Sequence, residues 1–214
     1  EELAATHPAA VLTQDGLQIY TALDAELQRA AEQAVQAGLA ELEQQYEWLR
    51  RTLATSRARH TFVFLHHLVC GETPEGRGGS EASHFFEWGG RELDGRNTFA
   101  QKRPGWEAPI HDLLVRRGPA IVFHGHDHLY VQQERDGIVY QLVPQPGHQR
   151  FDNIRSLDEY GYRSGVKQGA SGILRVAVDP VRAVVEYVRA YPDSAENATR
   201  RTGAVTHLYE VRGR

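Results

Sequence analysis

The chain has 214 residues, enough for one substantial domain or for one domain with an appendage. Its hydrophobic fraction of 41% and charged fraction of 24% are ordinary values for globular proteins, which excludes wholesale disorder. The formal net charge of −4 gives no dominant basic surface, and we therefore expect no nucleic-acid partner.

Cysteine content and hydropathy exclude two further classes of protein. The single cysteine, Cys70, rules out an intrachain disulfide framework and is best interpreted as a small apolar residue after a strand. No apolar run approaches the roughly 20 residues of a membrane span, so we expect no transmembrane segment. The chain contains no methionine, from which we expect a processed, truncated or assembled product of undetermined localisation.

The first quarter of the chain predicts a short strand followed by a long helix. The strand covers 16–24 and ends at Asp24, a residue type that caps helix N-termini. The helix is expected to run from there to about Arg57, because apolar residues recur at spacings of four and three. These residues are Val35, Leu39, Leu42, Tyr46, Leu49 and Leu53.

The middle of the chain alternates strands with a helix. TFVFLHHLV (61–69) is β-branched and aromatic and predicts a buried strand, followed by a Gly-rich loop at 71–80. A short helix is expected over 107–118 and a second strand over 120–124. Strand, helix, strand in this order predicts a parallel pair with a crossover helix, which places the chain in the α/β class.

Hairpins are expected in the last third. Asp136–Gly137 lies between two apolar segments, which is a strong hairpin signal. Two alternating strands follow, GILRVAV and VRAVVEYVRAY, joined at Asp179–Pro180. A last strand is expected over 204–211.

Histidines gather where the two predicted parallel strands end. AIVFHGHDHLY (120–130) has three histidines at alternate positions, His124, His126 and His128, and the strand over 61–69 leads into His66 and His67. Carboxyl ends of parallel strands lie at one edge of a sheet, so both groups are expected to share a site. In an extended segment, His126 and His128 would face one pocket. Neutral imidazole is a common ligand of zinc and similar metals, so the pattern predicts a metal site.

The chain from about residue 45 to residue 212 resembles the C-terminal half of the calcineurin-like metallophosphoesterases, the superfamily of the purple acid phosphatases. The residues that carry the resemblance are FVFLHH with VFHGHDHLY, together with QYEWLRRTL, FEWGG, RPGW, APIHDLLV, DGIVYQLVPQPG, SGILRVAV and VVEYVRAY. The resemblance implies a partial metallophosphoesterase-type β-sandwich with flanking helices, preceded here by the long N-terminal helix.

The resemblance also implies roles for individual histidines. His66 and His126 would bind one metal ion, and His128 would bind a second. His67 would be the catalytic residue in contact with the phosphoryl group, with support of the metal ligands from behind, or an exchange of roles with His66, as the alternatives. His124 lies outside the family's motif and is expected to be structural, with a place in the site as the alternative.

The implied activity is metal-dependent hydrolysis of a phosphate mono- or diester. Members of the family hold two divalent ions drawn from Zn, Mn and Fe, which activate a bridging hydroxide for attack on phosphorus. The family takes its remaining ligands from Asp-x-His, Gly-Asp and Gly-Asn-His motifs, none of which occurs in this chain. We therefore expect impaired activity and one ion or none, unless a partner chain or Glu81, Asp94 or Asp127 supplies the missing carboxylates.

The segment before this half resembles a different family. Residues 16–44 are similar to the stretch that follows the glycosyltransferase domain in class A penicillin-binding proteins, without that family's Ser-x-x-Lys and Lys-Thr-Gly motifs. Two pieces are therefore expected, 1–45 with a strand and the long helix and 46–214 with the metallophosphoesterase-like half. The alternatives to an esterase are a non-catalytic metal-binding remnant and a cell-envelope interaction module. Relatives of the second piece are often exported, which points to an extracytoplasmic location.

Overall fold

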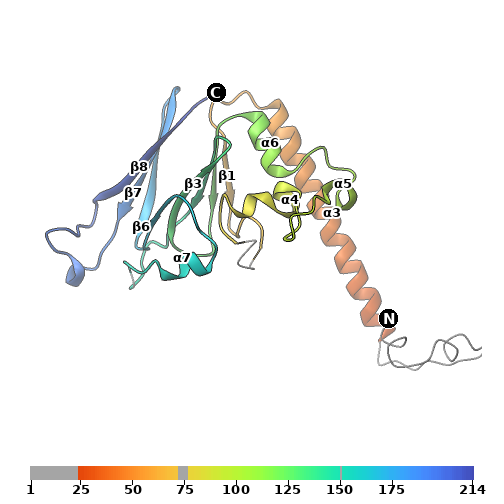
Figure 1. Ribbon diagram of the computed structural model, residues 1–214, viewed down its shortest axis with the longest axis horizontal. Coiled ribbons are helices and arrows are strands. Elements are labelled where there is room, and N and C mark those ends of the chain that lie inside the picture. Colours follow the sequence, from red (N-terminus) through yellow and green to blue (C-terminus); the bar gives the residue numbers. More distant parts are fainter. Residues whose placement is uncertain (1–23, 72–76, 150) are drawn as a thin grey trace, which may run out of the picture. The chain divides into compact units, whose positions relative to one another are not determined.

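The computed structural model describes residues 24–71, 77–149 and 151–214 (Figure 1). The chain divides into two compact units, Glu1–Gln45 and Tyr46–Arg214. The strand expected over 16–24 lies outside the described residues apart from Asp24 itself. In the second unit, α/β topology with two sheets agrees with the class predicted from the sequence.

The long predicted helix is confirmed as α3, Ala25–Thr55. The Asp24 carboxylate caps it by accepting hydrogen bonds from the backbone N–H groups of Glu26 at 2.8 Å and Leu27 at 3.1 Å. These two bonds lower the pKa of Asp24. Among the described residues, no helix is both long and apolar enough to cross a bilayer.

The last turns of α3 belong to the second unit and are anchored there by Tyr46. This ring is buried and stacks on Trp106 with 3.7 Å between the centroids. Its hydroxyl donates to the carbonyl oxygen of Ala108 at 2.8 Å and accepts from the Ala108 N–H at 3.1 Å. Tyr46, one of the apolar residues at helical spacing in the predicted helix, therefore attaches α3 to the loop that precedes α6, Ile110–Arg117.

Five strands form the first sheet, in the order β1-β2-β4-β3-β5. Strands β1, β2 and β4 are parallel neighbours, whereas β3 is antiparallel to both β4 and β5. The bounds are β1 Phe62–Leu65, β2 Ala120–His124, β3 Tyr130–Arg135, β4 Ile138–Leu142 and β5 Val166–Gln168. The strand expected over 61–69 is thus shorter than predicted, since pairing ends at Leu65.

The predicted hairpin is confirmed between β3 and β4. Asp136 and Gly137 both have positive φ, 52° and 78°, as a two-residue type I′ turn requires. The crossover helix α6 packs on this sheet through His111, whose Nδ1 lies 2.7 Å from the Tyr140 hydroxyl oxygen. The shorter helices are η1 Ala82–His84, α4 Phe86–Gly89, α5 Phe99–Lys102, α7 Arg155–Glu159 and η2 Asp193–Ala195.

The second sheet has three antiparallel strands, β6 Gly172–Val178, β7 Arg182–Arg189 and β8 Val205–Arg212, in that order. It packs face to face with the first sheet, as Figure 1 shows from the side. The shared core contains Ile121, Phe123 and Val139 from the first sheet and Ala183 and Val185 from the second. A two-layer sandwich results, because each sheet buries the apolar face that its alternating pattern provides.

A tyrosine pair links the two layers at the β3 end of the sandwich. Tyr130 and Tyr187 are fully buried and stack with 4.4 Å between the ring centroids. The Tyr130 hydroxyl also forms a 2.6 Å hydrogen bond with Nδ1 of His207 on β8. By contrast, the nearby hydroxyl of Tyr209 is buried and has no hydrogen-bond partner.

Removing these two hydroxyl groups should have opposite consequences. Tyr130→Phe should lower the free energy of unfolding by about 1–2 kcal/mol, because the His207 ring loses its partner. Tyr209→Phe should cost nothing or stabilise slightly, because that hydroxyl is desolvated without a hydrogen bond. Urea unfolding of the two variants would measure the difference, and equal losses would contradict the assignment of the inter-sheet hydrogen bond.

Candidate functional site

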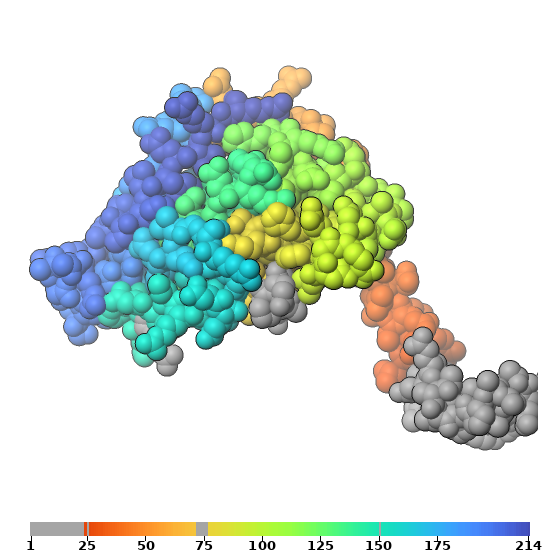
Figure 2. Space-filling view, viewed as in Figure 1, coloured from red at the N-terminus to blue at the C-terminus, as the bar shows by residue number. Residues whose placement is uncertain are grey.

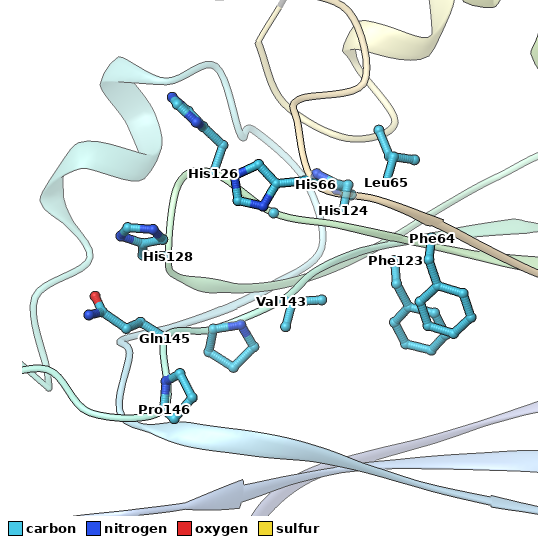
Figure 3. A pocket seen from close by; sticks show the side chains of 12 residues that line it. Phe64, Leu65, His66, Phe123, His124, His126, His128, Val143, Gln145 and Pro146 are labelled. Carbon is cyan, nitrogen blue, oxygen red and sulfur yellow. The ribbon is translucent and has the colours of Figure 1, made fainter.

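The two histidine groups lie at the same edge of the first sheet. β1 and β2 are parallel with Leu65 opposite His124, so the residues that follow each strand meet there. A cavity of about 500 Å³ opens at this edge and is lined by His66, His126 and His128 (Figure 3). This histidine pocket is also lined by Phe64, Leu65, Phe123, His124, Gly125, Val143, Pro144, Gln145 and Pro146.

Gly125 is required by the close approach of the two strand ends. A Cβ atom placed there would lie 2.8 Å from the carbonyl oxygen of His66, which is shorter than real contacts of this kind. Gly125 does not have a positive φ angle, so backbone conformation is not the reason for a glycine here. The absence of a side chain therefore serves to bring the backbone of His66 against the loop that follows β2.

His126 and His128 have left-handed backbone conformations, with φ of 76° and 61°. The prediction that this segment is extended is therefore wrong, because the chain bends at His126 and Asp127. Such conformations cost a non-glycine residue on the order of 1 kcal/mol each and persist only where surrounding contacts impose them. Two examples within three residues indicate a loop whose shape is determined by its surroundings.

Asp127 provides the constraint on this loop. Its side chain has no exposed surface and pairs with the Arg77 guanidinium, whose Nε lies 3.0 Å and 3.1 Å from the two carboxylate oxygens. The Tyr162 hydroxyl donates to Oδ2 at 2.9 Å, and burial followed by the Asp127 charge raises the pKa of Tyr162. Asp127 thus points away from the histidine pocket and holds the loop from behind.

Sequence reasoning did not find Arg77 and Tyr162. They lie 50 and 35 residues from Asp127 along the chain, so no local spacing connects them. The available signal was Asp127 itself, because a carboxylate inside a run of buried residues needs a cationic or hydrogen-bonding partner.

His67 lies against His126 rather than at a separate position. Their rings are stacked, with 4.8 Å between the centroids and 22° between the planes. The side chain of His67 is exposed, so a ligand at the rim of the histidine pocket could reach it. The residue expected to be catalytic and a residue expected to bind metal are therefore direct neighbours.

His124 is buried beneath the histidine pocket and is 1% exposed. Neither of its ring nitrogens has a hydrogen-bond partner among the described residues, and burial lowers the pKa of the ring to about 4. The ring lies parallel to Tyr162, with 6.5 Å between the centroids. A neutral imidazole packed in this way matches the structural role expected for His124.

The described residues of the pocket do not by themselves form a finished metal site. Figure 3 shows the rings of His66, His126 and His128 pointing in different directions. Among the described residues, no group of three or more His, Cys, Asp or Glu side chains is arranged to hold a metal ion. His66 and His128 are exposed, so their rings can turn towards a common point without loss of packing. The three imidazoles could then coordinate one metal ion, but they could not bridge two metal ions.

The three acidic residues considered as substitute ligands have other partners. Glu81 accepts hydrogen bonds from the N–H and hydroxyl groups of Ser164 at 2.9 Å and 2.8 Å, and Asp94 pairs with Arg96 on the surface. Asp127 is held by Arg77. None of the three lines the histidine pocket, so the missing carboxylates are not found among these residues.

Comparison with known proteins assigns no family to this chain. No protein-family profile matches it, and no curated protein matches it.

The Asp127 contacts predict a large effect on stability. Asp127→Ala should lower the free energy of unfolding by about 3 kcal/mol or more, because Arg77 keeps a mostly buried charge without its partner. Asp94→Ala removes an exposed pair and should cost at most about 1 kcal/mol. Denaturant titration would compare the two variants. Equal small losses would contradict the role of Asp127 in holding the loop after β2.

Burial of His124 predicts a pH dependence. The pKa of the ring is depressed from 6.5 to about 4 in the folded state, so the unfolded chain binds more protons between these values. Protonation of the unfolded chain therefore favours unfolding at low pH. The contribution of His124 to the free energy of unfolding is fully present above pH 6.5 and falls by about 3 kcal/mol as the pH drops to 4. Unfolding of wild type and His124→Leu in metal-free buffer at pH 7 and 5 should show a smaller decline in the variant. Parallel declines would contradict this assignment.

Proposed function

We propose that the histidine pocket binds one divalent transition-metal ion and is the imidazole half of a calcineurin-like phosphoesterase site. The observation that carries the proposal is the delivery of His66, His126 and His128 to one sheet edge by two neighbouring parallel strands. The left-handed conformations of His126 and His128 support it, because backbone strain of this kind clusters at ligand sites.

The residues of this chain would divide the work as follows. His66, His126 and His128 would hold the ion through neutral imidazole nitrogens, and His67 at the rim would contact a phosphoryl oxygen. Apolar side chains, among them Leu65 and Phe123, would limit the access of water from below. When bound, a divalent ion lowers the pKa of a coordinated water and polarises a phosphoryl oxygen.

The activity of this chain alone should be low or absent. A second ion needs a bridging carboxylate, and the described residues that line the pocket include none. We therefore propose that a partner chain supplies Asp or Glu ligands, as the resemblance to a half-domain suggests. An approach past β1 is favoured because it is the edge strand of its sheet and Phe64 there is 74% exposed.

A non-catalytic metal-binding remnant is the second candidate. It is favoured by the lack of a converged ligand group among the described residues. The two proposals differ in turnover but share the prediction of metal uptake at the histidine pocket. The third alternative, a cell-envelope interaction module, rests on the resemblance of residues 16–44 to penicillin-binding proteins. It stays a proposal for which we assign no binding residues.

Metal titration tests the shared part. Calorimetry with Zn²⁺ or Mn²⁺ on metal-free protein should give about one ion per chain, and His126→Ala should weaken binding by at least about tenfold. His84→Ala is the matched control, because His84 is an exposed histidine that does not line the pocket. No uptake by the wild type, or equal uptake by His126→Ala, would contradict both candidate functions.

Turnover separates the two candidates. Chromogenic phosphate mono- and diesters are assayed with the metal-loaded chain at a range of added Zn²⁺ or Mn²⁺. Slow hydrolysis that disappears in His126→Ala but persists in His84→Ala supports the esterase. Metal uptake without any hydrolysis leaves the non-catalytic remnant.

A further inference from the structure

An arginine cluster lies at the opposite end of the first sheet from the histidine pocket. After α3 the chain runs through Arg57 and Arg59 into β1, and α6 ends at Arg117 just before β2. The backbone N–H of Arg214 donates to the carbonyl oxygen of Arg59 at 2.8 Å, which brings the end of β8 to the same place. These four arginines line one cavity of about 630 Å³.

Figures 1 and 2 show this convergence. The segment after α3, the end of α6 and the end of β8 meet beside the label C in Figure 1, where Figure 2 shows orange, green and dark blue atoms together. All of these segments belong to the unit from Tyr46 to Arg214. The remaining lining consists of the end of α3, Ser56 and Ala58, without an acidic side chain.

In the part of the chain that the structure describes, no acidic side chain lines the cavity of the cluster. Among the described residues, no carboxylate forms an ion pair with Arg57, Arg59, Arg117 or Arg214. Two neighbouring arginines differ in this respect. Arg50 and Arg116, in the adjoining depression, both pair with the Glu107 carboxylate, at 3.4 Å and 2.8 Å. Like charges gathered without a counter-charge repel one another, and an anion in the cavity would remove that repulsion.

Arg117 shows that the cavity is a built feature rather than a chance group of surface arginines. The residue is only 5% exposed, and its Nη2 donates to the carbonyl oxygen of Ala58. Its Nε is buried and has no hydrogen-bond partner among the described residues. A buried guanidinium N–H without an acceptor carries a desolvation penalty that a bound oxyanion would offset.

The cluster is separate from the histidine pocket. Arg59 precedes β1 and His66 follows it, so the two sites lie at opposite ends of the same strand. The same holds for β2, which Arg117 precedes and His126 follows. A ligand at the arginines therefore does not occupy the histidine pocket.

We propose that the cavity formed by Arg57, Arg59, Arg117 and Arg214 binds the phosphoryl groups of a small polyphosphate. Guanidinium groups present paired N–H donors in a plane, which matches phosphate oxygens in bidentate geometry. The cavity of about 630 Å³ lies within the range of small-molecule sites and leaves room for more than one phosphoryl group. Because the chain as a whole has a net charge of −4, uptake of anions depends on this local cluster.

The test uses the 214-residue chain and inorganic pyrophosphate, with calorimetry at 150 mM salt. The wild type should bind, and Arg57→Gln should weaken binding by about tenfold or more, since a charge-assisted hydrogen bond is lost. The Arg57 side chain is exposed and makes no hydrogen bond with described residues, so the variant should fold normally. Arg201→Gln, an exposed arginine far along the chain, is the matched control and should bind as the wild type does.

The outcomes discriminate as follows. No binding by the wild type, or equal binding by Arg57→Gln, overturns the proposal. If the arginines only complement the carbonyl end of α3, Arg57→Gln lowers the Tm without changing pyrophosphate affinity, which also overturns it. Equal binding of citrate would show that the cluster does not select phosphoryl groups and would also overturn the proposal. A nucleoside 5′-diphosphate that binds tighter than pyrophosphate identifies a nucleotide as the source, and equal binding identifies a free polyphosphate; both support the site.

Discussion

The parallel pairing of β1 with β2 is the constraint on which both candidate sites depend. Backbone hydrogen bonds place Phe62 to Leu65 beside Ile121 to His124, so the segments that follow the strands meet at one edge and those that precede them meet at the other. At the carboxyl edge the meeting is close enough that only glycine fits at Gly125. A parallel pair needs a crossover, and α6 provides it while it delivers Arg117 to the amino edge.

The charges of the two edges differ in kind. The carboxyl edge collects imidazoles, and Asp127 in the described loop after β2 is neutralised from behind by Arg77. That arrangement stabilises the strained loop but removes from the pocket the ligand that a two-metal site needs. The amino edge collects guanidinium groups without any carboxylate in the cavity lining. Among the residues that the structure describes, neither cavity lining contains a carboxylate side chain. This is consistent with a cation site that is completed from outside and an anion site that a ligand fills.

The sandwich gives the two edges a rigid support. Ile121 and Phe123 of β2 are buried against β7, and the Tyr130–Tyr187 stack joins the layers further along. Rigidity is lower at β1, which is an edge strand with Phe64 exposed. His66 follows this strand and is itself exposed, so its ring has more freedom than the loop that carries His126. The half of the pocket on β2 is held in place, and the half on β1 is adjustable.

Local sequence determined the elements, because their signals lie within a few residues of one another. Asp24 caps α3 through its own neighbours, Asp136–Gly137 forms a two-residue turn, and histidines after two apolar runs indicated a shared edge. Only the tertiary structure decided the left-handed bend after β2 and the burial of Asp127, because the partner Arg77 is 50 residues away. The arginine cluster was also invisible in the sequence. Its members lie after α3, at the end of α6 and after β8, and only long-range packing brings separated charges to one cavity.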